Sequence, residues 1–505
     1  MAVSRTYTAE PSVLKGDIVT VEADLTRGLH SFTIVGLPGK AVEEAKDRVS
    51  AAIKNSGFKS PKSRNEKVVI SLSPADLKKE GPLFDLPIAI AYLGAAGEIQ
   101  NFNEKTLLIG ELSLDGTLRE VRGVLPAVIE GKRRGFKEVV VPYQNKDEAA
   151  LIEGIKILPA KNLLGVIKHL NKESADHEPL SPAPLTKIVP SRRENQVTLD
   201  DIKGQETAKR GLIIAAAGRH NVVMAGPPGT GKTMLARAFA GLLPPLSREE
   251  ALEVMSIHSL VGALTSGITA EPPFRSPHHT ASHTALVGGG AHPRPGEVTL
   301  AHHGVLFMDE FPEFDRRSLD ALRQPLEDRV VSISRVKGSA IFPADFVLLA
   351  ALNPYRGVED GTTNYSAAMM ETYKEKISGP ILDRIDLYLE VPHVPYETLT
   401  NTKKKTNETG EAIEKIVQAR EKQAKRLESR GIRTNSGMSS RDIEEVIFLS
   451  DEVKELLKIS AARLNLSPRS YHRLIKVSRT IADLEESEDI EESHVLEALQ
   501  YRVKL

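Results

Sequence analysis

The chain has 505 residues, enough for about three domains of ordinary size, and 40% of them are hydrophobic, which is ample for packed cores. It contains no cysteine, which excludes disulfides and any zinc or iron–sulfur site that depends on thiolates. The formal net charge of −1 argues against a uniformly basic surface, so any contact with nucleic acid has to be local.

The start of the sequence has no continuous apolar core behind a basic head, so we expect no signal peptide. No apolar run approaches the ~20 residues that a bilayer requires. We therefore expect a soluble cytoplasmic protein with no membrane segment.

Residues 1–170 are predicted to form a mixed α/β domain. Alternating apolar and polar residues predict strands at 17–23, 31–35, 68–72, 107–112 and 138–142. Helical spacing of apolar residues predicts helices at 39–55, 86–93 and 124–134. Because these helices fall between strands, we expect a sheet with helices packed on it. Residues 171–195 are polar and contain four prolines, which predicts an extended linker.

Two segments of this first domain resemble the proteolytic domain of Lon-type proteases, which has a ribosomal-S5-like fold. Residues 79–85 (KEGPLFD) resemble the loop with the serine nucleophile, and residues 111–125 resemble the segment with the lysine base. Leu83 and Leu125 stand at these two positions. An acyl-transfer nucleophile needs an activated hydroxyl or thiol and a base within reach, which two leucines do not supply. We expect a catalytically inactive structural, oligomerising or partner-binding module.

The stretch 222–233 (VVMAGPPGTGKT) joins a short apolar strand, a glycine-rich turn and the start of a helix. This arrangement binds polyphosphate, because glycines let backbone N–H groups converge on phosphate oxygens at a helix N-terminus. We expect Lys232 to reach the β- and γ-phosphates of ATP and Thr233 to ligate Mg²⁺. The predicted nucleotide-binding residues of this P-loop are Gly226, Pro227, Pro228, Gly229, Thr230, Gly231, Lys232 and Thr233.

Two later apolar runs each end in polar side chains. Residues 304–310 end in Asp309, expected to hold Mg²⁺ through water, and Glu310, expected to polarise the attacking water as general base. Residues 346–354 end in Asn353, which either holds the lytic water or the γ-phosphate, or forms a turn before proline. Apolar strands interleaved with helices predict a doubly wound parallel sheet.

In this order the motifs resemble AAA+ ATPases, and among them the magnesium-chelatase and MCM branch. Residues 274–303 fit an insertion in the second helix, and residues 330–342 fit a hairpin before the sensor strand. Residues 274–314 (FRSPHHTASHTALVGGGAHPRPGEVTLAHHGVLFMDEFPEF) and 28–38 (GLHSFTIVGLP) closely resemble the ComM/YifB family, described as magnesium-chelatase-like. The resemblance covers nearly the whole chain.

This resemblance implies an α/β fold with a P-loop AAA+ parallel sheet core, an N-terminal S5/Lon-like α+β domain and a C-terminal helical lid. The expected boundaries are 1–170 for the Lon-like domain, 171–195 for the linker, 196–395 for the AAA+ core and 396–505 for the lid. Relatives often carry a cysteine-rich loop after the sensor Asn-Pro. Residues 355–365 contain no thiol, so no metal role of that loop transfers.

The resemblance also assigns arginines. Arg384, in Leu-Asp-Arg-Ile-Asp, resembles the arginine finger that reaches a neighbouring subunit, and Arg469 resembles the second sensor, with Arg473 as the alternative. A surface salt bridge is the ordinary alternative for each. A finger that acts on a neighbour requires a ring, so we expect a homohexamer.

Five histidines invite a zinc interpretation, namely His278, His279, His283, His302 and His303. Without cysteine or a carboxylate at ligand spacing nearby in the sequence, hydrogen bonds or phosphate contacts are the favoured interpretation.

The family implies an ATP-driven DNA motor, with branch migration or helicase action on recombination intermediates, as in natural transformation. Arg335 and Lys337 at the hairpin tip would grip DNA phosphates, although such charges are usually only solvated. The main alternative is a chelatase-type ATPase that remodels a protein for metal insertion, against which the Lon-like domain speaks. A protein partner would bind through that domain.

Overall fold

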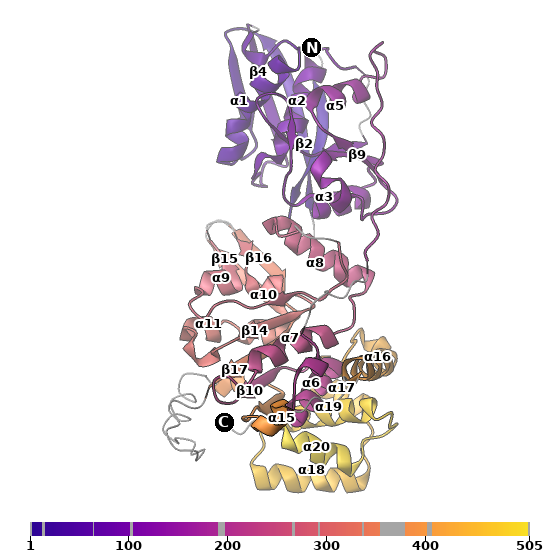
Figure 1. Cartoon of the computed structure of the whole chain (residues 1–505). Coiled ribbons are helices and arrows are strands. Elements are labelled where there is room, and N and C mark those ends of the chain that lie inside the picture. The colour runs from indigo at the N-terminus through magenta and orange to yellow at the C-terminus, as the bar shows by residue number, and fades with distance from the viewer. Residues whose placement is uncertain are drawn as a thin grey trace. The chain divides into compact units, whose positions relative to one another are not determined.

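The computed structural model describes residues 3–12, 16–63, 65–100, 105–189, 197–264, 268–290, 293–335, 338–353, 379–400 and 407–502. The chain divides into two compact units (Figure 1). The first unit comprises residues 1–189 and 255–269, and the second comprises residues 190–254 and 270–505. The later turns of helix α8 (Arg248–Val261) therefore belong to the first unit, an assignment that the sequence did not predict.

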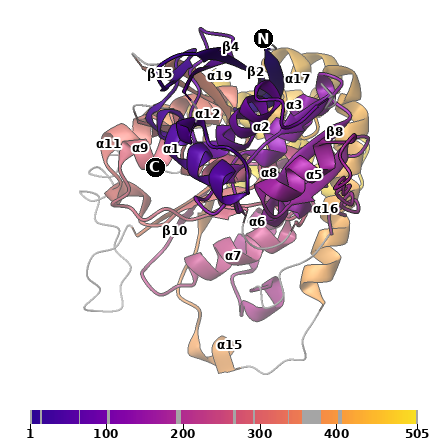
Figure 2. The ribbon, with the colours of Figure 1, turned by 90° about the horizontal axis from the view of Figure 1, so that it is seen from above.

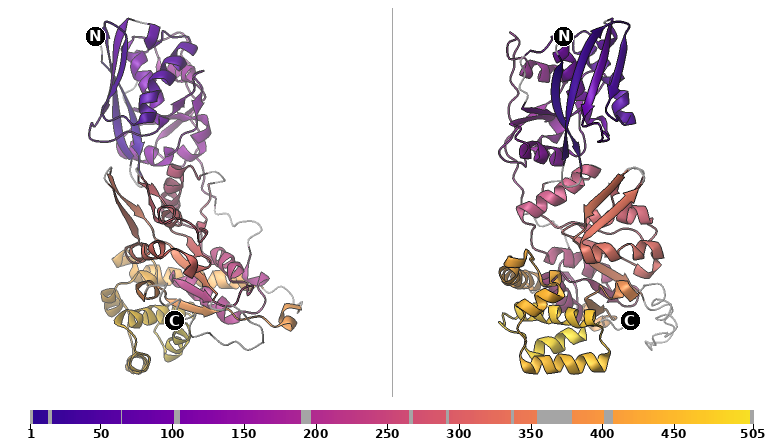
Figure 3. Two further views of the ribbon diagram at one scale, coloured as in Figure 1. Left: turned by 90° about the vertical axis from the view of Figure 1, so that its left-hand side faces the viewer. Right: turned by 180° about the vertical axis from the view of Figure 1, so that it is seen from behind.

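The first unit is built on a seven-stranded mixed sheet with the order β3-β4-β2-β1-β5-β8-β9. Its helices lie on one face of this sheet (Figure 3), where they cover the inward-pointing apolar residues of the strands. The strands are β1 (Ser4–Pro11), β2 (Gly16–Arg27), β3 (Ser31–Val35), β4 (Glu66–Ser73), β5 (Thr106–Leu108), β6 (Glu111–Leu112), β7 (Leu118–Arg119), β8 (Glu138–Pro142) and β9 (Lys156–Ala160). The helices are α1 (Lys40–Asn55), α2 (Asp85–Ala95), α3 (Val124–Arg133), α4 (Lys146–Ala149) and α5 (Leu163–Leu170).

Part of the predicted linker packs on the first unit. Residues 171–189 have no regular helix or strand, but the backbone N–H groups of Ala183 and Thr186 donate to Ile157 O and Ala150 O. The chain therefore runs along the surface of the unit instead of leaving it at residue 170.

The second unit contains the predicted parallel sheet, with the order β11-β14-β17-β10-β18. Every neighbouring pair in it is parallel, which confirms the prediction of a doubly wound fold. The strands are β10 (Val222–Ala225), β11 (Phe274–Arg275), β14 (Val305–Met308), β17 (Val347–Leu352) and β18 (Leu387–Glu390). Because parallel strands place their carboxyl ends at one edge, the residues that follow β10, β14 and β17 gather there.

The insertion and the hairpin are both present in the second unit. The insertion contains α9 (His283–Val287), α10 (Glu297–Leu300) and the short antiparallel pair β12 (Gly288–Gly289) and β13 (Arg294–Pro295). The hairpin consists of β15 (Val330–Arg335) and β16 (Gly338–Pro343), paired antiparallel from Val330–Pro343 to Arg335–Gly338.

The helical C-terminal region is also confirmed. The remaining helices of the unit are α6 (Glu206–Gly218), α7 (Lys232–Leu242), α11 (Arg316–Asp320), α12 (Arg323–Asp328), α14 (Gly379–Leu382), α15 (Tyr396–Thr400), α16 (Glu408–Leu427), α17 (Ser440–Val446), α18 (Asp451–Leu464), α19 (Pro468–Leu484) and α20 (Glu492–Gln500). One buried apolar cluster joins residues of the sheet, α6 and α7 to residues of α16–α20, so the sheet and the helical region share a core. Helix α15 lies apart from the other C-terminal helices (Figures 2 and 3). In the described part of the chain, no helix combines the length and apolar character needed to cross a bilayer.

Candidate nucleotide site

The P-loop lies between the end of β10 and the start of α7. Gly229 and Gly231 have φ values of 78° and 89°, a left-handed conformation that favours glycine. Glycine is required at position 226 for a different reason, because a Cβ there would lie 2.1 Å from the carbonyl oxygen of Val391. The loop thus needs its glycines both for its turn and for its close approach to the end of β18.

Lys232 and Thr233 begin α7 and take different positions. The Nζ atom of the buried Lys232 donates to the carbonyl oxygens of Gly226 and Pro227 at 2.8 and 2.7 Å. Burial lowers the pKa of this ammonium group from its usual value. The Thr233 hydroxyl donates to Asp309 Oδ2 at 3.1 Å.

The pairing of Thr233 with Asp309 joins two motifs that are 76 residues apart in the sequence. Mg²⁺ prefers hard oxygen ligands and usually keeps several waters, so a threonine hydroxyl and a carboxylate suit it. These are the two residues that would hold the ion next to the phosphates of ATP. The bound ion would supply charge neutralisation during phosphoryl transfer.

Glu310 follows Asp309 in a left-handed backbone conformation with φ of 51°. Its backbone N–H donates to Asp309 Oδ1 at 2.9 Å, and its side chain is half exposed. Oε2 of Glu310 lies 3.0 Å from Nδ1 of His279, which belongs to the insertion. The sequence did not predict this partner.

Asn353 lies one residue beyond β17, at the same edge of the sheet. The N–H of Gly226 donates to Leu352 O at 3.3 Å, so the position next to Asn353 contacts the first residue of the P-loop. Met308 pairs with Ala350 on the other side of β17. Asn353 therefore lies at the end of the strand between the strand that precedes the P-loop and the strand that precedes Asp309 and Glu310.

The two predicted catalytic arginines meet on one carboxylate. Arg384 and Arg469 both pair with Glu327 of α12, with a distance of 3.3 Å from Arg469 Nη2 to Glu327 Oε1. Burial, Arg469 and Arg323 lower the pKa of the Arg384 guanidinium from its usual value. The sequence gave no sign that Arg384 and Arg469 share a partner.

These arginines line a cavity of about 630 Å³. Its wall also carries Arg329, Arg473 and Lys476, so it is rich in cationic groups. Among the described residues, neither the P-loop 226–233 nor Asp309 and Glu310 contribute to this wall. One copy of the chain therefore presents the P-loop group and the arginine group at separate places.

Arg473, the alternative sensor, holds the segment that carries Arg384. It donates to the carbonyl oxygens of Leu382 (3.1 Å) and Ile385, and burial lowers its pKa from the usual value. Asn221 supports the same segment, because its Nδ2 donates to Arg384 O at 2.9 Å. Both side chains position the proposed finger from within the same chain, and Asn221 was missed by sequence reasoning.

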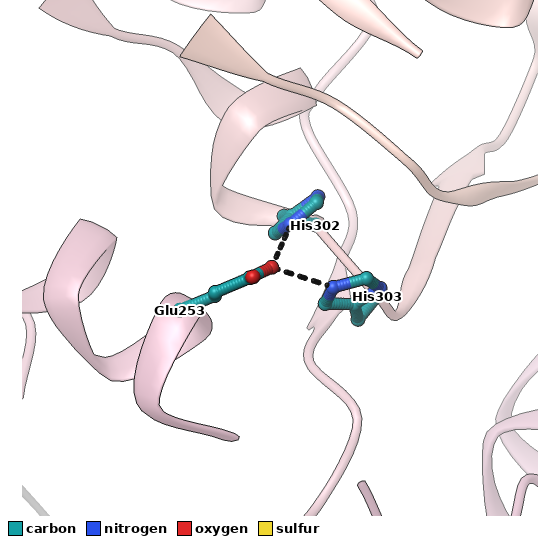
Figure 4. A group of neighbouring side chains, drawn as sticks. All are labelled: Glu253, His302 and His303. Carbon is teal, nitrogen blue, oxygen red and sulfur yellow. Dashed lines mark hydrogen bonds and ion pairs between the residues drawn. The ribbon is translucent and has the colours of Figure 1, made fainter. Parts of the chain in front are cut away.

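A second cluster lies at the opposite, amino-terminal edge of the sheet. His302 and His303 precede β14, and both Nε2 atoms approach Oε2 of Glu253, at 3.3 and 3.0 Å (Figure 4). The three ligand atoms lie within 4.8 Å of one another, which is close enough for a metal ion. The hydrogen bonds from His302 and His303 lower the pKa of Glu253 below its usual range.

The hydrogen bonds of His302 nevertheless favour a structural role. Its Nδ1 accepts the backbone N–H of Asp345 at 3.1 Å, so the neutral ring carries its proton on Nε2. That nitrogen then donates to Glu253 and offers no lone pair to a metal. Burial lowers the pKa of His302, which keeps the ring neutral. The cluster thus agrees with the interpretation of these histidines as hydrogen-bonding groups.

The Lon-like positions of the first unit carry no catalytic pair. Leu83 and Leu125 are both buried, and their backbones make ordinary contacts: Leu83 O accepts from Gly110 N, and Leu125 N donates to Glu148 Oε1.

The side chains of the two predicted DNA contacts, Arg335 and Lys337, are not among those that the structure describes. Lys337 lies outside the described residues, and for Arg335 only the backbone, at the end of β15, is described.

Family models match most of the chain in three parts. The model for magnesium chelatase, subunit ChlI, matches residues 198–399, and the model for the C-terminal part of the same subunit matches 406–502. A further model, for subunit ChlI of Mg-chelatase, matches residues 21–145. Together with the P-loop and the parallel sheet, these matches define a magnesium-chelatase-type AAA+ protein, a class whose members use nucleotide and Mg²⁺.

Individual relatives give a narrower assignment. The competence protein ComM of Haemophilus influenzae is 43% identical over 99% of this chain and 98% of its own length. The YifB protein of Escherichia coli is 42% identical over 99% of this chain and 97% of its own length. The chain belongs to this ComM/YifB family. A more distant likeness, 22% identity over 59% of this chain, is to the DNA replication licensing factor mcm6-A of Xenopus laevis.

Proposed function

We propose that this protein is an ATPase, that its working form is a ring of six copies of this chain, and that the ring moves on DNA. ATP binds the P-loop, with Mg²⁺ held by Thr233 and Asp309, and Glu310 activates the attacking water. Branch migration or helicase action on recombination intermediates is the proposed use of the hydrolysis.

The observation that carries the ring is the separation of the two halves of the site. Arg384 and Arg469 gather on Glu327 in a cavity whose wall contains none of the P-loop residues. Phosphoryl transfer needs cationic groups on the developing charge of the γ-phosphate. A second copy that brings its arginines to the first copy's P-loop supplies them, and repetition of that contact closes a ring.

The proposal of DNA as substrate rests on the relatives and the hairpin. ComM is named a competence protein, and the licensing factor mcm6-A is named for DNA replication. The hairpin β15–β16 carries Arg335 and Lys337 toward its tip in the sequence, and such cations suit phosphates of any sequence.

The test is ATP turnover titrated with single-stranded, duplex and four-way-junction DNA at two salt concentrations. We expect stimulation by DNA, strongest with the junction and weaker at high salt, because phosphate contacts release counterions. The variant with Arg335→Ala and Lys337→Ala should lose that stimulation and keep its basal turnover. Equal turnover with and without every DNA would contradict the proposal.

A chelatase-type ATPase that remodels a protein partner is the second candidate, favoured by the magnesium chelatase models that match the chain. Stimulation by an unfolded protein in place of DNA would support it.

A further inference from the structure

We infer that the first unit carries a DNA-binding surface of its own, a basic patch at the C-terminal end of α3 that contacts the phosphate backbone. The patch consists of five exposed residues: Lys105, Lys132, Arg133, Arg134 and Lys137. The inference rests on DNA as the proposed substrate and deepens that proposal, because it adds a second place at which the chain holds DNA. Since the formal net charge of the whole chain is −1, such a group of cations is a local feature.

A buried carboxylate holds the two arginines of the patch in place. Glu130, whose side chain is 2% exposed, accepts hydrogen bonds from Arg133 Nε and Nη2, both at 2.7 Å, and from Arg134 Nε at 2.8 Å. Both arginine side chains are still 57% exposed. Two cations on one carboxylate leave a surplus positive charge, and guanidinium groups that are fixed in advance lose less conformational freedom when they bind phosphate.

Lys105 and Lys137 extend the patch along the sheet. They precede the neighbouring parallel strands β5 and β8, and the N–H of Lys137 donates to Lys105 O at 3.1 Å. Because side chains alternate along a strand, both lysines belong to the face that carries Leu107. This is the face that α3 covers, since a Cβ on Gly131 would lie 2.9 Å from Leu107 Cδ2. The two lysines and the end of the helix therefore share one face of the sheet.

The turn between α3 and β8 has a fixed backbone. Gly135 ends the helix with a φ of 86°, and the N–H groups of Gly135 and Phe136 donate to carbonyl oxygens of the last turn of α3, both at 3.0 Å. The ring of Phe136 packs edge-on against that of Tyr7 in β1, with the ring centres 5.5 Å apart. The arginines before this turn and Lys137 after it are therefore held close together.

The arrangement of charge favours a polyanion as partner. In the part of the chain that the structure describes, no ion pair involves Lys132 or Lys137. Cations at the end of a helix complement its dipole, which accounts for Lys132 without a partner but not for Lys105 and Lys137, which lie outside the helix. Neighbouring strands are about 4.8 Å apart, so the patch is a row of closely spaced charges.

DNA fits this row because its backbone carries a charge at every nucleotide, and cations bind that backbone whatever the base sequence. An acidic protein segment is the alternative partner, and competition with poly-glutamate distinguishes it from DNA.

The first test removes three positive charges from the patch, by Lys105→Gln, Lys132→Gln and Lys137→Gln together. The control variant removes three charges from exposed lysines elsewhere in the same unit, by Lys40→Gln, Lys54→Gln and Lys67→Gln. Binding of fluorescent duplex DNA is measured without nucleotide at several salt concentrations. We expect the patch variant to bind about 30-fold more weakly at low salt, with a slope of log Kd against log salt that is shallower by about 2 to 3, because each phosphate contact contributes about 0.9. The control variant should bind as the natural protein does.

The second test changes the arginines and keeps their charge. Arg133→Lys with Arg134→Lys replaces two planar forks by point charges, so affinity should fall about threefold while the salt slope stays the same. A slope lowered as far as in the patch variant would contradict the inference.

Both tests are repeated in a chain with Arg335→Ala and Lys337→Ala, so that the hairpin tip does not contribute to binding. In this chain, poly-glutamate of equal total charge should displace the fluorescent duplex poorly. Displacement as efficient as that by unlabelled duplex would assign the patch to an acidic protein segment and overturn the inference.

A further readout uses the natural chain and needs no variant. A reagent that acylates exposed lysines should modify the three patch lysines about fivefold more slowly when DNA is present at about four times its Kd, by mass action. Lys40 and Lys54 should react at an unchanged rate. Mass spectrometry of the peptides measures each lysine separately.

Three results would overturn the inference: equal affinity of the patch and control variants, equal protection of all these lysines, or no binding of DNA by the natural protein. ATP turnover judges the proposed motor separately. If the patch variant loses affinity but no DNA stimulates turnover, DNA binding by the patch stands and the motor function fails. If DNA stimulates turnover and the two variants bind equally, the inference alone fails.

Discussion

Two regions of this molecule resemble enzyme active sites, and they differ in what their side chains can do. At the carboxyl edge of the ATPase sheet, the Thr233 hydroxyl contacts Asp309 and Glu310 follows directly. In the first unit, the positions of a serine and a lysine are held by Leu83 and Leu125, both buried in the core. The polar side chains that the sequence predicts for catalysis are present in the second unit, whereas leucines stand at the corresponding positions of the first.

The comparison shows that fold and chemistry are separable. The loop 79–85 of the first unit is held by structural contacts of its own. Glu10 Oε2 accepts the N–H of Glu80, and the buried Lys79 donates from Nζ to Gly36 O at 3.0 Å. In the second unit, polar side chains lie at the predicted nucleotide site. In the first unit, Glu10 and Lys79 form hydrogen bonds that hold the loop in place.

The largest effect is expected from Lys232→Ala in the P-loop. Loss of the ammonium group removes the charge that would meet the β- and γ-phosphates, so ATP binding and turnover should both disappear. Equilibrium binding of a fluorescent ATP analogue measures this. Lys422→Ala, on the exposed side of α16, is the control and should bind normally.

Glu310→Gln should separate binding from chemistry. The amide keeps the shape of the side chain and cannot take a proton, so turnover should fall about 10²–10³-fold while ATP still binds. Single-turnover hydrolysis together with a binding titration tests this, with Glu313→Gln as the neighbouring control. Normal turnover in Glu310→Gln would refute its assignment as the base.

Arg384→Ala should lower turnover by about 10³-fold and leave ATP affinity nearly unchanged, since a finger acts on the charge of the transition state. The control is Arg316→Ala, whose exposed side chain pairs only weakly with Asp320 at 4.0 Å. If Arg384→Ala and Arg316→Ala lose the same amount of turnover, Arg384 forms only an ion pair and is not an arginine finger.

The smallest effect is expected in the first unit, from Glu10→Gln. Burial raises the pKa of Glu10 to about 8 in the folded protein, above its ordinary value of 4.5. The folded state therefore keeps a proton that the unfolded chain loses, and stability falls as pH rises from about 5 to 8. Glu10→Gln should remove this fall, measured as Tm at pH 6 and pH 9. Glu43→Gln, exposed on α1, should retain it.

Much of the fold could be predicted because its signals are local. Three predicted elements agree with the structure to within a residue at each end: the strand at 31–35 with β3, the helix at 39–55 with α1 and the helix at 124–134 with α3. Their signal is the spacing of apolar residues, which depends only on neighbouring residues in the sequence. β1 was missed although Ser4–Pro11 alternates buried and exposed residues, because its apolar signal is weak and threonines fill the inward positions. The two-residue strand β11 is too short to give any pattern.

The site divides in the same way. Thr233, Asp309 and Glu310 belong to contiguous motifs, and the sequence predicts them directly. The partners of Arg384 could not be predicted in this way, because they are distant in the sequence. Glu327 is 57 residues from Arg384, and Asn221 is 163 residues from it. The signal that could have found His279 is its place just after the strand next to β14, which becomes visible only when the strand order is known.

The central claim is that one copy supplies the P-loop and another supplies Arg384. Its most direct test mixes two inactive variants, Lys232→Ala and Arg384→Ala, in equal amounts and measures ATP turnover. In a mixed ring, a normal P-loop from one variant meets a normal arginine from the other at about a quarter of the interfaces, so activity should reappear. If the mixture stays as inactive as its components, although the variants assemble together, the site is complete within one chain and the account is wrong.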